Sequence, residues 1–193
     1  MDSDIMTNIE DLPATPWWME DPDVTKAWAM AKAAHAGAKR KYNNRPYITH
    51  PLTVASMVSE AGGSSDMVSA ALLHDVIEDT SITKEEIAYH LNQTIAGLVD
   101  ALTNRSKPED GNRSQRKRID REHLWRASPD AQTIKYCDII DNTRYIVQDD
   151  PKFAKTYLQE KWLLLRGLDK GWDRLHRQAM DSVVDGLIEL VNR

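Results

Sequence analysis

Residues 70–80 read AALLHDVIEDT and place four ionisable side chains within six positions of an otherwise apolar stretch. The spacing is helical, and Ser65 is suited to cap a helix that runs from Asp66 through Asp79. Burying charged groups in an apolar helix costs free energy unless a partner or a metal ion compensates them. The stretch therefore predicts a helix built around a chemical site.

The four ionisable residues fall on one side of this expected helix. His74 lies above Glu78 at i+4, and Asp75 lies above both Glu78 and Asp79. One turn then presents a pair suited to metal binding, and the next presents two carboxylates suited to acid/base work. The alternative is an amphipathic surface helix with incidental polar residues, which the apolar flanks disfavour.

A single His-Asp pair does not make a metal site, so further ligands are needed. His50 precedes Pro51 where a loop meets an expected helix, and Asp138 interrupts a mainly apolar helix. With His74 and Asp75 they give two imidazoles and two carboxylates, a donor set suited to Mn, Fe or Zn. Four protein ligands leave open positions for water and substrate on a six-coordinate ion.

Helical periodicity runs through nearly the whole chain, and no run of residues alternates as a strand does. Thr83 followed by Glu86 predicts a capping box at the start of a short helix. The fold class is therefore all-α, with about eight to ten helices. The other expected helices span residues 23–35, 51–61, 66–79, 94–103, 114–127, 130–147, 151–168 and 172–191.

Length and composition set further bounds. The chain has 193 residues and a mass of 22.0 kDa, which fits one domain. Its single cysteine, Cys137, excludes an internal disulfide framework and favours a reducing compartment. No stretch approaches the ~18 apolar residues of a membrane span, and the acidic start is unlike a signal peptide. We expect a cytoplasmic protein with no membrane association.

Charge is unevenly distributed around the net value of -5. Residues 1–23 carry seven acids, three prolines and no Lys or Arg, which predicts an acidic leader before a single domain at 24–193. Residues 104–126 carry eight basic and four acidic side chains. That segment is either a solvated helix face or a site for an anionic ligand. The net charge argues against general nucleic-acid binding.

The order of these motifs resembles the HD-domain hydrolases of the RelA/SpoT type, and most closely the stand-alone small alarmone hydrolases of the Mesh1 type. The resemblance extends from about Val24 to Leu187. It rests on motifs that occur in this chain as Ala34-His35 with Arg40-Lys41, residues 46–51 (PYITHP), residues 74–80 (HDVIEDT), Leu98-Val99 with Leu102-Thr103, and residues 134–138 (IKYCD) with Asn142 and Arg144.

The resemblance implies an HD-domain helical bundle and a Mn²⁺-dependent (p)ppGpp 3′-pyrophosphohydrolase that releases pyrophosphate and GDP or GTP. The implied substrate is a small nucleotide, and the resemblance implies no nucleic-acid partner and no obligate protein partner. By motif position, the resemblance implies that the metal ligands are His50, His74, Asp75 and Asp138. It implies that the residues activating water are Glu78 and Asp79. It implies that the residues contacting the substrate are Arg40, Lys41, Asn142 and Arg144.

Some positions depart from the family pattern. The loop between Lys41 and Pro46 is one residue longer than usual, Tyr136-Cys137 replaces Leu-Ala, and Asp141 stands where His or Tyr is usual. We expect these changes at the nucleotide end of the site. Two alternatives therefore stay open: a hydrolase of another nucleotide, such as an adenine alarmone, a nucleoside monophosphate or NADPH, and a non-catalytic alarmone-binding or antitoxin-like module.

Overall fold

The computed structural model describes residues 20–41 and 44–193, so the expected leader at 1–23 lies almost wholly outside the described residues. Within these ranges the chain is helical, and the pairing of Lys39 with Pro46 is an isolated bridge. The all-α prediction is confirmed. The helices are α1 (Pro22–Ala34), α2 (Thr49–Glu60), α3 (Ser65–Leu73), α4 (Val76–Asp79), α5 (Lys84–His90), α6 (Gln93–Leu102), the 3-10 helix η3 (Pro108–Asp110), α7 (Arg113–Arg126), α8 (Pro129–Asp149), α9 (Pro151–Leu165) and α10 (Asp173–Val191).

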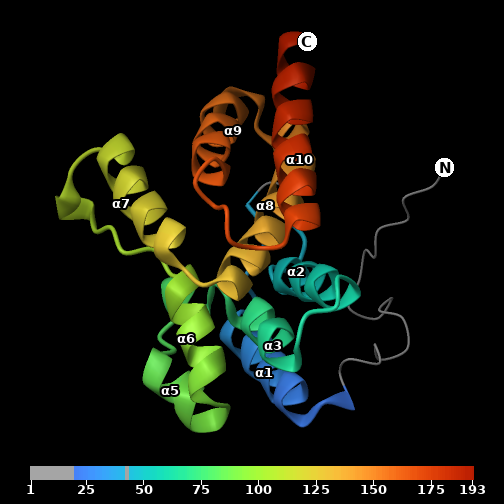
Figure 1. The fold of residues 1–193 in the computed structure, drawn as a ribbon, viewed down its shortest axis with the longest axis vertical. Helices are drawn as coiled ribbons and strands as arrows, with labels where there is room; N and C mark the ends of the chain where they lie inside the picture. The colour runs from blue at the N-terminus through green and yellow to red at the C-terminus, as the bar shows by residue number, and fades with distance from the viewer. Residues whose placement is uncertain (1–19, 42–43) are drawn as a thin grey trace.

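Helix α8 lies at the centre of the molecule (Figure 1). It packs against α2, α3 and α6 along one part of its length and against α9 and α10 along another. Several of its apolar side chains are fully buried, including Ile134, Tyr136 and Ile139. Helix α8 therefore joins the group of helices α1–α6 to the group α7, α9 and α10.

Two helices are capped one or two residues before the expected capping residue. Asp21, not Asp23, caps α1, because its carboxylate accepts hydrogen bonds from the backbone of Asp23 at 2.9 Å and of Val24 at 3.3 Å. Pro22 then occupies the first helical position, where a missing N–H costs nothing. Ser64, not Ser65, caps α3 by the same kind of bond. The helices exist as predicted, and only their caps move.

The expected continuous helix over residues 66–79 is wrong, since α3 ends at Leu73 and α4 begins at Val76. His74 and Asp75 form a turn between them, with Asp75 at φ -103° and ψ -6°. The imidazole Nδ1 of His74 lies 2.8 Å from the carbonyl oxygen of Ala71 and donates to it. The break means that His74 and Glu78 do not stack one above the other.

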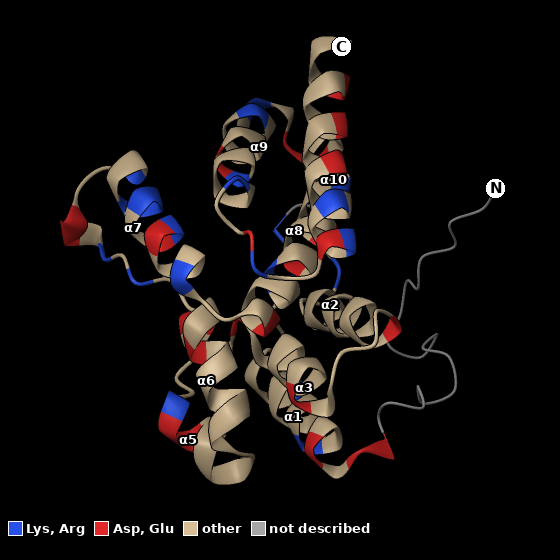
Figure 2. Ribbon diagram, viewed as in Figure 1, with Lys and Arg blue, Asp and Glu red and all other residues tan. Residues whose placement is uncertain are grey.

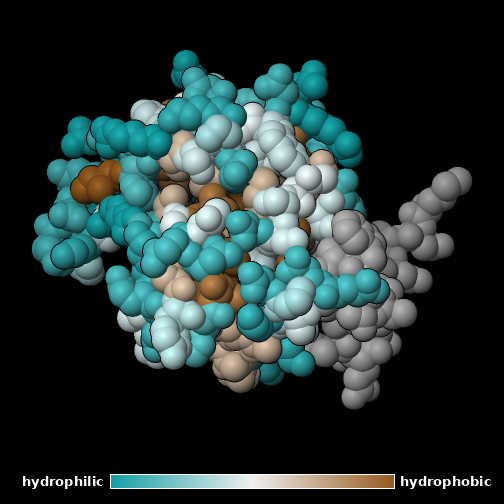
Figure 3. All heavy atoms as spheres, turned by 60° about the horizontal axis from the view of Figure 1, so that its bottom comes forward, coloured by the Kyte–Doolittle hydropathy of each residue, from teal (hydrophilic) through white to brown (hydrophobic). Residues whose placement is uncertain are grey.

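The molecular surface is mostly polar among the described residues. The face in Figure 3 is largely hydrophilic, and its apolar patches are interrupted by polar side chains. Figure 2 shows Lys and Arg gathered on α7 and on the segment leading into it, as the charge count of 104–126 predicts. No described helix is both long enough and apolar enough to cross a membrane.

Candidate metal centre and its cavity

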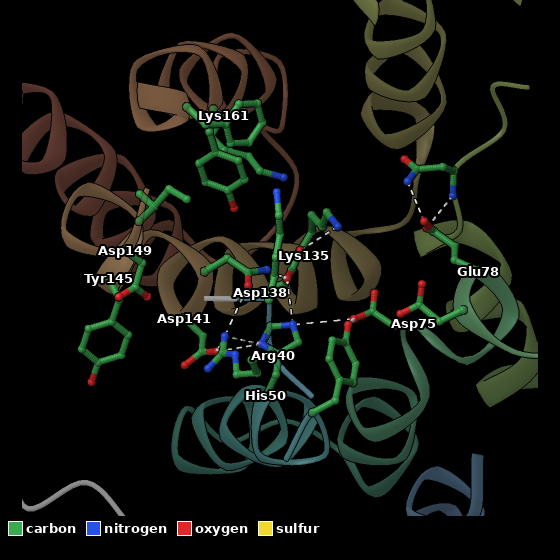
Figure 4. Close-up of a pocket in the computed structure, with 18 residues that line it drawn as sticks. Arg40, His50, Asp75, Glu78, Lys135, Asp138, Asp141, Tyr145, Asp149 and Lys161 are labelled. Carbon is green, nitrogen blue, oxygen red and sulfur yellow. Dashed lines mark hydrogen bonds and ion pairs between the residues drawn. The ribbon is translucent and has the colours of Figure 1, made fainter. Parts of the chain in front are cut away.

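The four predicted metal ligands converge where α2, the α3–α4 turn and α8 meet. Figure 4 shows three of them, His50, Asp75 and Asp138. The Nε2 atom of His50 lies 3.2 Å from Nε2 of His74 and 3.2 Å from Oδ1 of Asp138. Nε2 of His74 lies 3.1 Å from Oδ2 of Asp75. The ligand atoms of His50, His74 and Asp75 all lie within 4.8 Å of one another, and Asp138 adds a fourth donor beside both imidazoles.

This donor set fits a divalent metal ion. Both imidazoles are 1% exposed, and each uses its Nδ1 elsewhere, so its Nε2 is free to bind a cation. Nδ1 of His50 lies 2.6 Å from Oδ2 of Asp141, and Nδ1 of His74 bonds the Ala71 carbonyl. A second partner of this kind fixes the tautomer and orientation of a metal-binding histidine.

The charges at the centre favour a cation. Burial lowers the pKa of His74, but the Asp75 and Asp138 carboxylates outweigh it and raise that pKa well above its ordinary value. Burial raises the pKa of Asp138, but the neighbouring Lys135 and the two imidazoles hold it well below its ordinary value. The carboxylates therefore stay ionised, and a metal ion would take the place of protons on the imidazoles.

Asp141 organises a second layer around His50. Its Oδ2 accepts from Nη2 of Arg40 at 2.6 Å as well as bonding His50 at 2.6 Å. The Arg40 side chain is only 16% exposed and also reaches Oδ1 of Asn142 at 3.4 Å. Arg40, expected near the nucleotide, is thus held in the layer behind His50, and Asp141 has a role that motif position did not indicate.

The two carboxylate ligands are also held by neighbours. Asp138 accepts from Nδ2 of Asn142 at 2.6 Å through Oδ1, and its Oδ2 lies 2.6 Å from Nζ of Lys135. The hydroxyl of Tyr47 donates to Asp75. Tyr47 and Lys135 stand inside the motifs PYITHP and IKYCD, yet sequence reasoning gave neither a role. Lys135 reaches Asp138 along the same helix, three residues away, whereas Tyr47 reaches Asp75 from the separate segment that precedes α2.

Glu78 and Asp79 lie at the wall of the cavity rather than among the metal donors. Glu78 accepts from the backbone N of Asn104 at 2.7 Å and from its Nδ2 at 2.6 Å, as Figure 4 shows. Desolvation at the wall and the neighbouring Asp75 charge raise the pKa of Asp79. The two carboxylates face the same space as the metal donors and differ in how each is held.

Three of the four candidate metal donors, His50, Asp75 and Asp138, line an open cavity of about 340 Å³. Lys41 and Asn142 line it, whereas Arg144 is exposed and lines a separate hollow beside α2 and α10. Tyr136 and Cys137, expected at the nucleotide end, are fully buried instead. The Tyr136 hydroxyl donates to the carbonyl of Leu168 at 2.8 Å, so this departure from the family pattern serves packing.

Comparison with known proteins gives consistent results. The HD domain family model matches residues 27–161. The guanosine-3′,5′-bis(diphosphate) 3′-pyrophosphohydrolase MESH1 of Xenopus tropicalis is 35% identical over 171 residues, covering 86% of this chain and 90% of that protein. The human MESH1 is 30% identical over 169 residues, covering 85% and 92%.

A solved structure described as a metazoan ortholog of SpoT that hydrolyzes ppGpp has the same fold. Its TM-score is 0.76 at 23% sequence identity, and the match covers 90% of this chain and 97% of that one. The fold, the paired His-Asp motif and the family match agree on one conclusion. The chain belongs to the HD domain family and is a relative of the MESH1 proteins.

Proposed function

We propose that this protein is a metal-dependent (p)ppGpp 3′-pyrophosphohydrolase that yields GDP or GTP and pyrophosphate. The observation that carries the proposal is the convergence of His50, His74, Asp75 and Asp138 beside an open cavity, which His50, Asp75 and Asp138 line. Relatives that share 30 to 35% identity over most of their length are named for this reaction. The alternative of a non-catalytic binding module lacks support, because the donors and both flanking carboxylates are in place.

The four donors would hold one divalent ion. We assign Mn²⁺, with Fe and Zn as the other ions suited to this mixed nitrogen and oxygen set. When bound, such an ion polarises a phosphoryl oxygen and acidifies a water molecule. Asp141 and Asn142 keep His50 and Asp138 oriented for this task. Metal content after purification, and recovery of activity with each ion after chelation, would identify the native metal.

Glu78 and Asp79 take the acid/base role in our proposal. The oxygen of water bonds to the phosphorus attached to the ribose 3′-oxygen, and the bond between that phosphorus and the 3′-oxygen breaks. One carboxylate accepts the proton that the water loses, and the 3′-oxygen gains a proton to become a hydroxyl. Glu78 is positioned by two hydrogen bonds from Asn104, and the raised pKa of Asp79 suits a base.

Substrate contact is assigned to Lys41, which lines the cavity with Phe153 and whose Nζ lies 5.7 Å from the centre of that ring. Arg40 and Asn142 also line the cavity, and we assign them a positioning role because their side chains bond Asp141 and Asp138. Arg144 receives no role, since it lies outside this cavity.

A substrate panel tests the proposal. Protein loaded with Mn²⁺ is incubated with ppGpp, pppGpp, ppApp, GMP and NADPH, and the products are resolved by anion exchange. We expect GDP or GTP with pyrophosphate, only with metal and only with an intact Asp75. An EDTA arm and Asp75→Asn serve as controls.

The same panel separates the remaining possibilities. A higher kcat/KM for ppApp, GMP or NADPH would keep the metal chemistry and change the substrate. Arg40 pairs with Asp141 and is therefore not free to contact the base of the nucleotide. For this reason ppApp, the adenine alarmone, is the most informative comparison with ppGpp. No turnover of any compound by protein shown to hold metal would overturn the proposed activity.

A further inference from the structure

A second hollow adjoins the cavity at the metal centre. It measures about 90 Å³ and shares Asn104, Lys135, Tyr157 and Lys161 with the larger cavity, so the two are adjacent. Helix α7, the basic segment noted in the sequence, contributes the outer wall. The mechanism above uses neither Tyr157 nor Lys161, although both lie between the metal centre and this wall.

Lys161 brings a partly buried positive charge to this place. Figure 4 shows its side chain extending from α9 towards Lys135 and Asp138 on α8. Among the residues that the structure describes, no carboxylate pairs with Lys161, and its Nζ lies 5.1 Å from the centre of the Tyr157 ring. Burial and the nearby Lys135 charge lower the pKa of Lys161 to about 8. Its ammonium group therefore lacks a compensating anion.

Tyr157 supplies a hydrogen-bond donor at the same place. Its hydroxyl is buried and has no partner within the described ranges, 20–41 and 44–193. Burial raises its pKa well above the ordinary value, so the hydroxyl keeps its proton. An unsatisfied buried polar group costs free energy, and such a group in a native structure calls for a missing ligand or water.

Two other basic side chains of the hollow, Arg113 and Lys117, already have acidic partners. Arg113 bonds Glu160 through two nitrogens at 2.7 and 2.8 Å, and Nζ of Lys117 lies 3.8 Å from Asp120. Lys161 differs from these two because no carboxylate of the described residues pairs with it, and the same holds for Arg121 at the α7 wall. Lys161 and Tyr157 both line the junction of the two hollows, and a cation and a hydroxyl donor without partners there are suited to an anion with several acceptor oxygens.

We propose that Lys161, Lys135 and Tyr157 form an anion subsite that holds the outer phosphate of the 3′-diphosphate and then the departing pyrophosphate. This inference rests on the proposed function. Lys135 bonds the metal ligand Asp138 at 2.6 Å, so the subsite begins beside the metal centre. The outer phosphate shares a bridging oxygen with the phosphate that is attacked. When the attacked phosphate lies at the metal centre, the outer phosphate is therefore the group that can reach the adjoining subsite.

Binding of pyrophosphate tests the subsite without turnover. Titration calorimetry is done on metal-free protein in EDTA, because pyrophosphate itself binds metal ions. We expect Lys161→Gln to weaken binding by tenfold or more, since it removes a charge-assisted hydrogen bond, and Tyr157→Phe to weaken it by about fivefold. Lys155→Gln, an exposed lysine on the same helix, should bind as the wild type does.

The variants also need a check on folding. Circular dichroism and melting temperature should match the wild type, and Lys161→Arg should recover much of the lost affinity because it restores the charge. Equal affinity in the wild type and in Lys161→Gln would overturn the subsite.

Paired substrates then identify the phosphate that the subsite holds. Guanosine 5′-diphosphate 3′-monophosphate lacks the outer 3′-phosphate, and guanosine 5′-monophosphate 3′-diphosphate lacks the outer 5′-phosphate. We expect Lys161→Gln to reduce kcat/KM for both 3′-diphosphates by a similar factor and to leave that for the 3′-monophosphate nearly unchanged. A loss that follows the 5′-group instead would overturn the assignment.

The two proposals fail separately in these experiments. Wild-type protein that binds pyrophosphate through Lys161 but hydrolyses none of the nucleotides supports the anion subsite and overturns the proposed activity. Protein that hydrolyses ppGpp with no effect of Lys161→Gln or Tyr157→Phe supports the activity and overturns the subsite.

Discussion

At the residue scale, one carboxylate, that of Asp141, fixes the orientation of the His50 imidazole and so the direction in which its Nε2 points. Asp141 bonds His50 and Arg40 with the same oxygen, each at 2.6 Å, and these bonds hold its pKa below the ordinary value despite burial. It therefore stays ionised and keeps the His50 proton on Nδ1. The next residue, Asn142, supports Asp138 in the opposite sense, because its Nδ2 donates to Oδ1 of Asp138.

Asp141→Asn should weaken metal binding by about 10- to 100-fold, because the second partner of a metal-bound histidine contributes on that scale. Competition with a fluorescent chelator measures the affinity. Asp185→Asn, at an exposed carboxylate on α10, is the matched control and should leave it unchanged. Unchanged affinity in Asp141→Asn would show that His50 needs no such partner.

Glu78→Gln should keep the metal and lower kcat by about 10² to 10⁴, the range expected for losing a general acid or base. Metal content is measured on the same samples used for kinetics. Asp75→Asn provides the contrast, since it should lose metal and turnover together. A normal rate in Glu78→Gln would move the acid/base role to Asp79 alone.

Pyrophosphate affinity should depend on pH through Lys161. Its pKa of about 8 lies below the usual 10.5, so the ammonium form is lost as pH rises through that region and binding weakens. The charges around it are Lys135 and Asp138 on α8, Lys117 on α7 and Glu160 on α9. Pyrophosphate also titrates, so the ratio of wild-type to Lys161→Gln affinity between pH 7 and 9.5 is the measured quantity. A constant ratio would contradict the prediction.

The sequence indicated four side chains that the structure brings together, and their role as metal ligands stays a prediction. His50, His74, Asp75 and Asp138 stand out as charged groups in apolar surroundings, a signal that a single sequence contains. Asp141 is separated from His50 by 91 residues, and the bond between them depends on how α2 packs on α8. In the sequence, Lys161 and Tyr157 have the pattern of ordinary residues of an amphipathic helix. That they lack partners can be recognised only from the three-dimensional structure.

At the element scale, helix ends were predictable to within a few residues wherever a cap or proline marks them. The Thr83 capping box was predicted and is confirmed. The Thr83 side chain accepts a hydrogen bond from the Glu86 backbone N–H, and the Glu86 carboxylate accepts one from the Thr83 backbone N–H at 2.8 Å. The break between α3 and α4 was not predictable, because the apolar pattern continues across it. Contacts of His74 and Asp75 with other helices outweigh the local preference for an unbroken helix.

Thr83→Ala should lower the free energy of unfolding by about 1 kcal/mol, the usual cost of removing an N-cap. Urea unfolding followed by circular dichroism measures it, and metal affinity should stay the same because α5 contributes no ligand. Thr94→Ala, at an exposed position in the first turn of α6, should change stability by less than about 0.5 kcal/mol. Equal effects of the two substitutions would argue that the Thr83 cap contributes nothing.

At the scale of the whole molecule, the metal centre joins parts of the chain that are far apart in sequence. Its donors come from α2, the α3–α4 turn and α8, and α8 in turn contacts α9 and α10. An unfolded chain cannot bring these donors together. Metal binding must therefore stabilise the folded state against unfolding.

Mn²⁺ at about 100 times its Kd should stabilise the protein by about 2.7 kcal/mol relative to EDTA. For a chain of this size that is a rise in Tm of about 5 to 10 °C. Thermal melts with and without the ion measure the shift. Asp138→Asn should lose most of it, and the same rise in that variant would show that the ion stabilises the protein from another site.

The central position of α8 also determines which mutations it can tolerate. Lys135, Asp138, Asp141 and Asn142 share one side of it because they are three or four residues apart. A single inserted or deleted residue between them would rotate the later side chains by about 100° relative to the earlier ones. Helical content would hardly change, yet the metal ligand Asp138, the residues that support it and the anion subsite would no longer face the same side of the helix. In this helix, length is under stricter constraint than the chemistry of most individual positions.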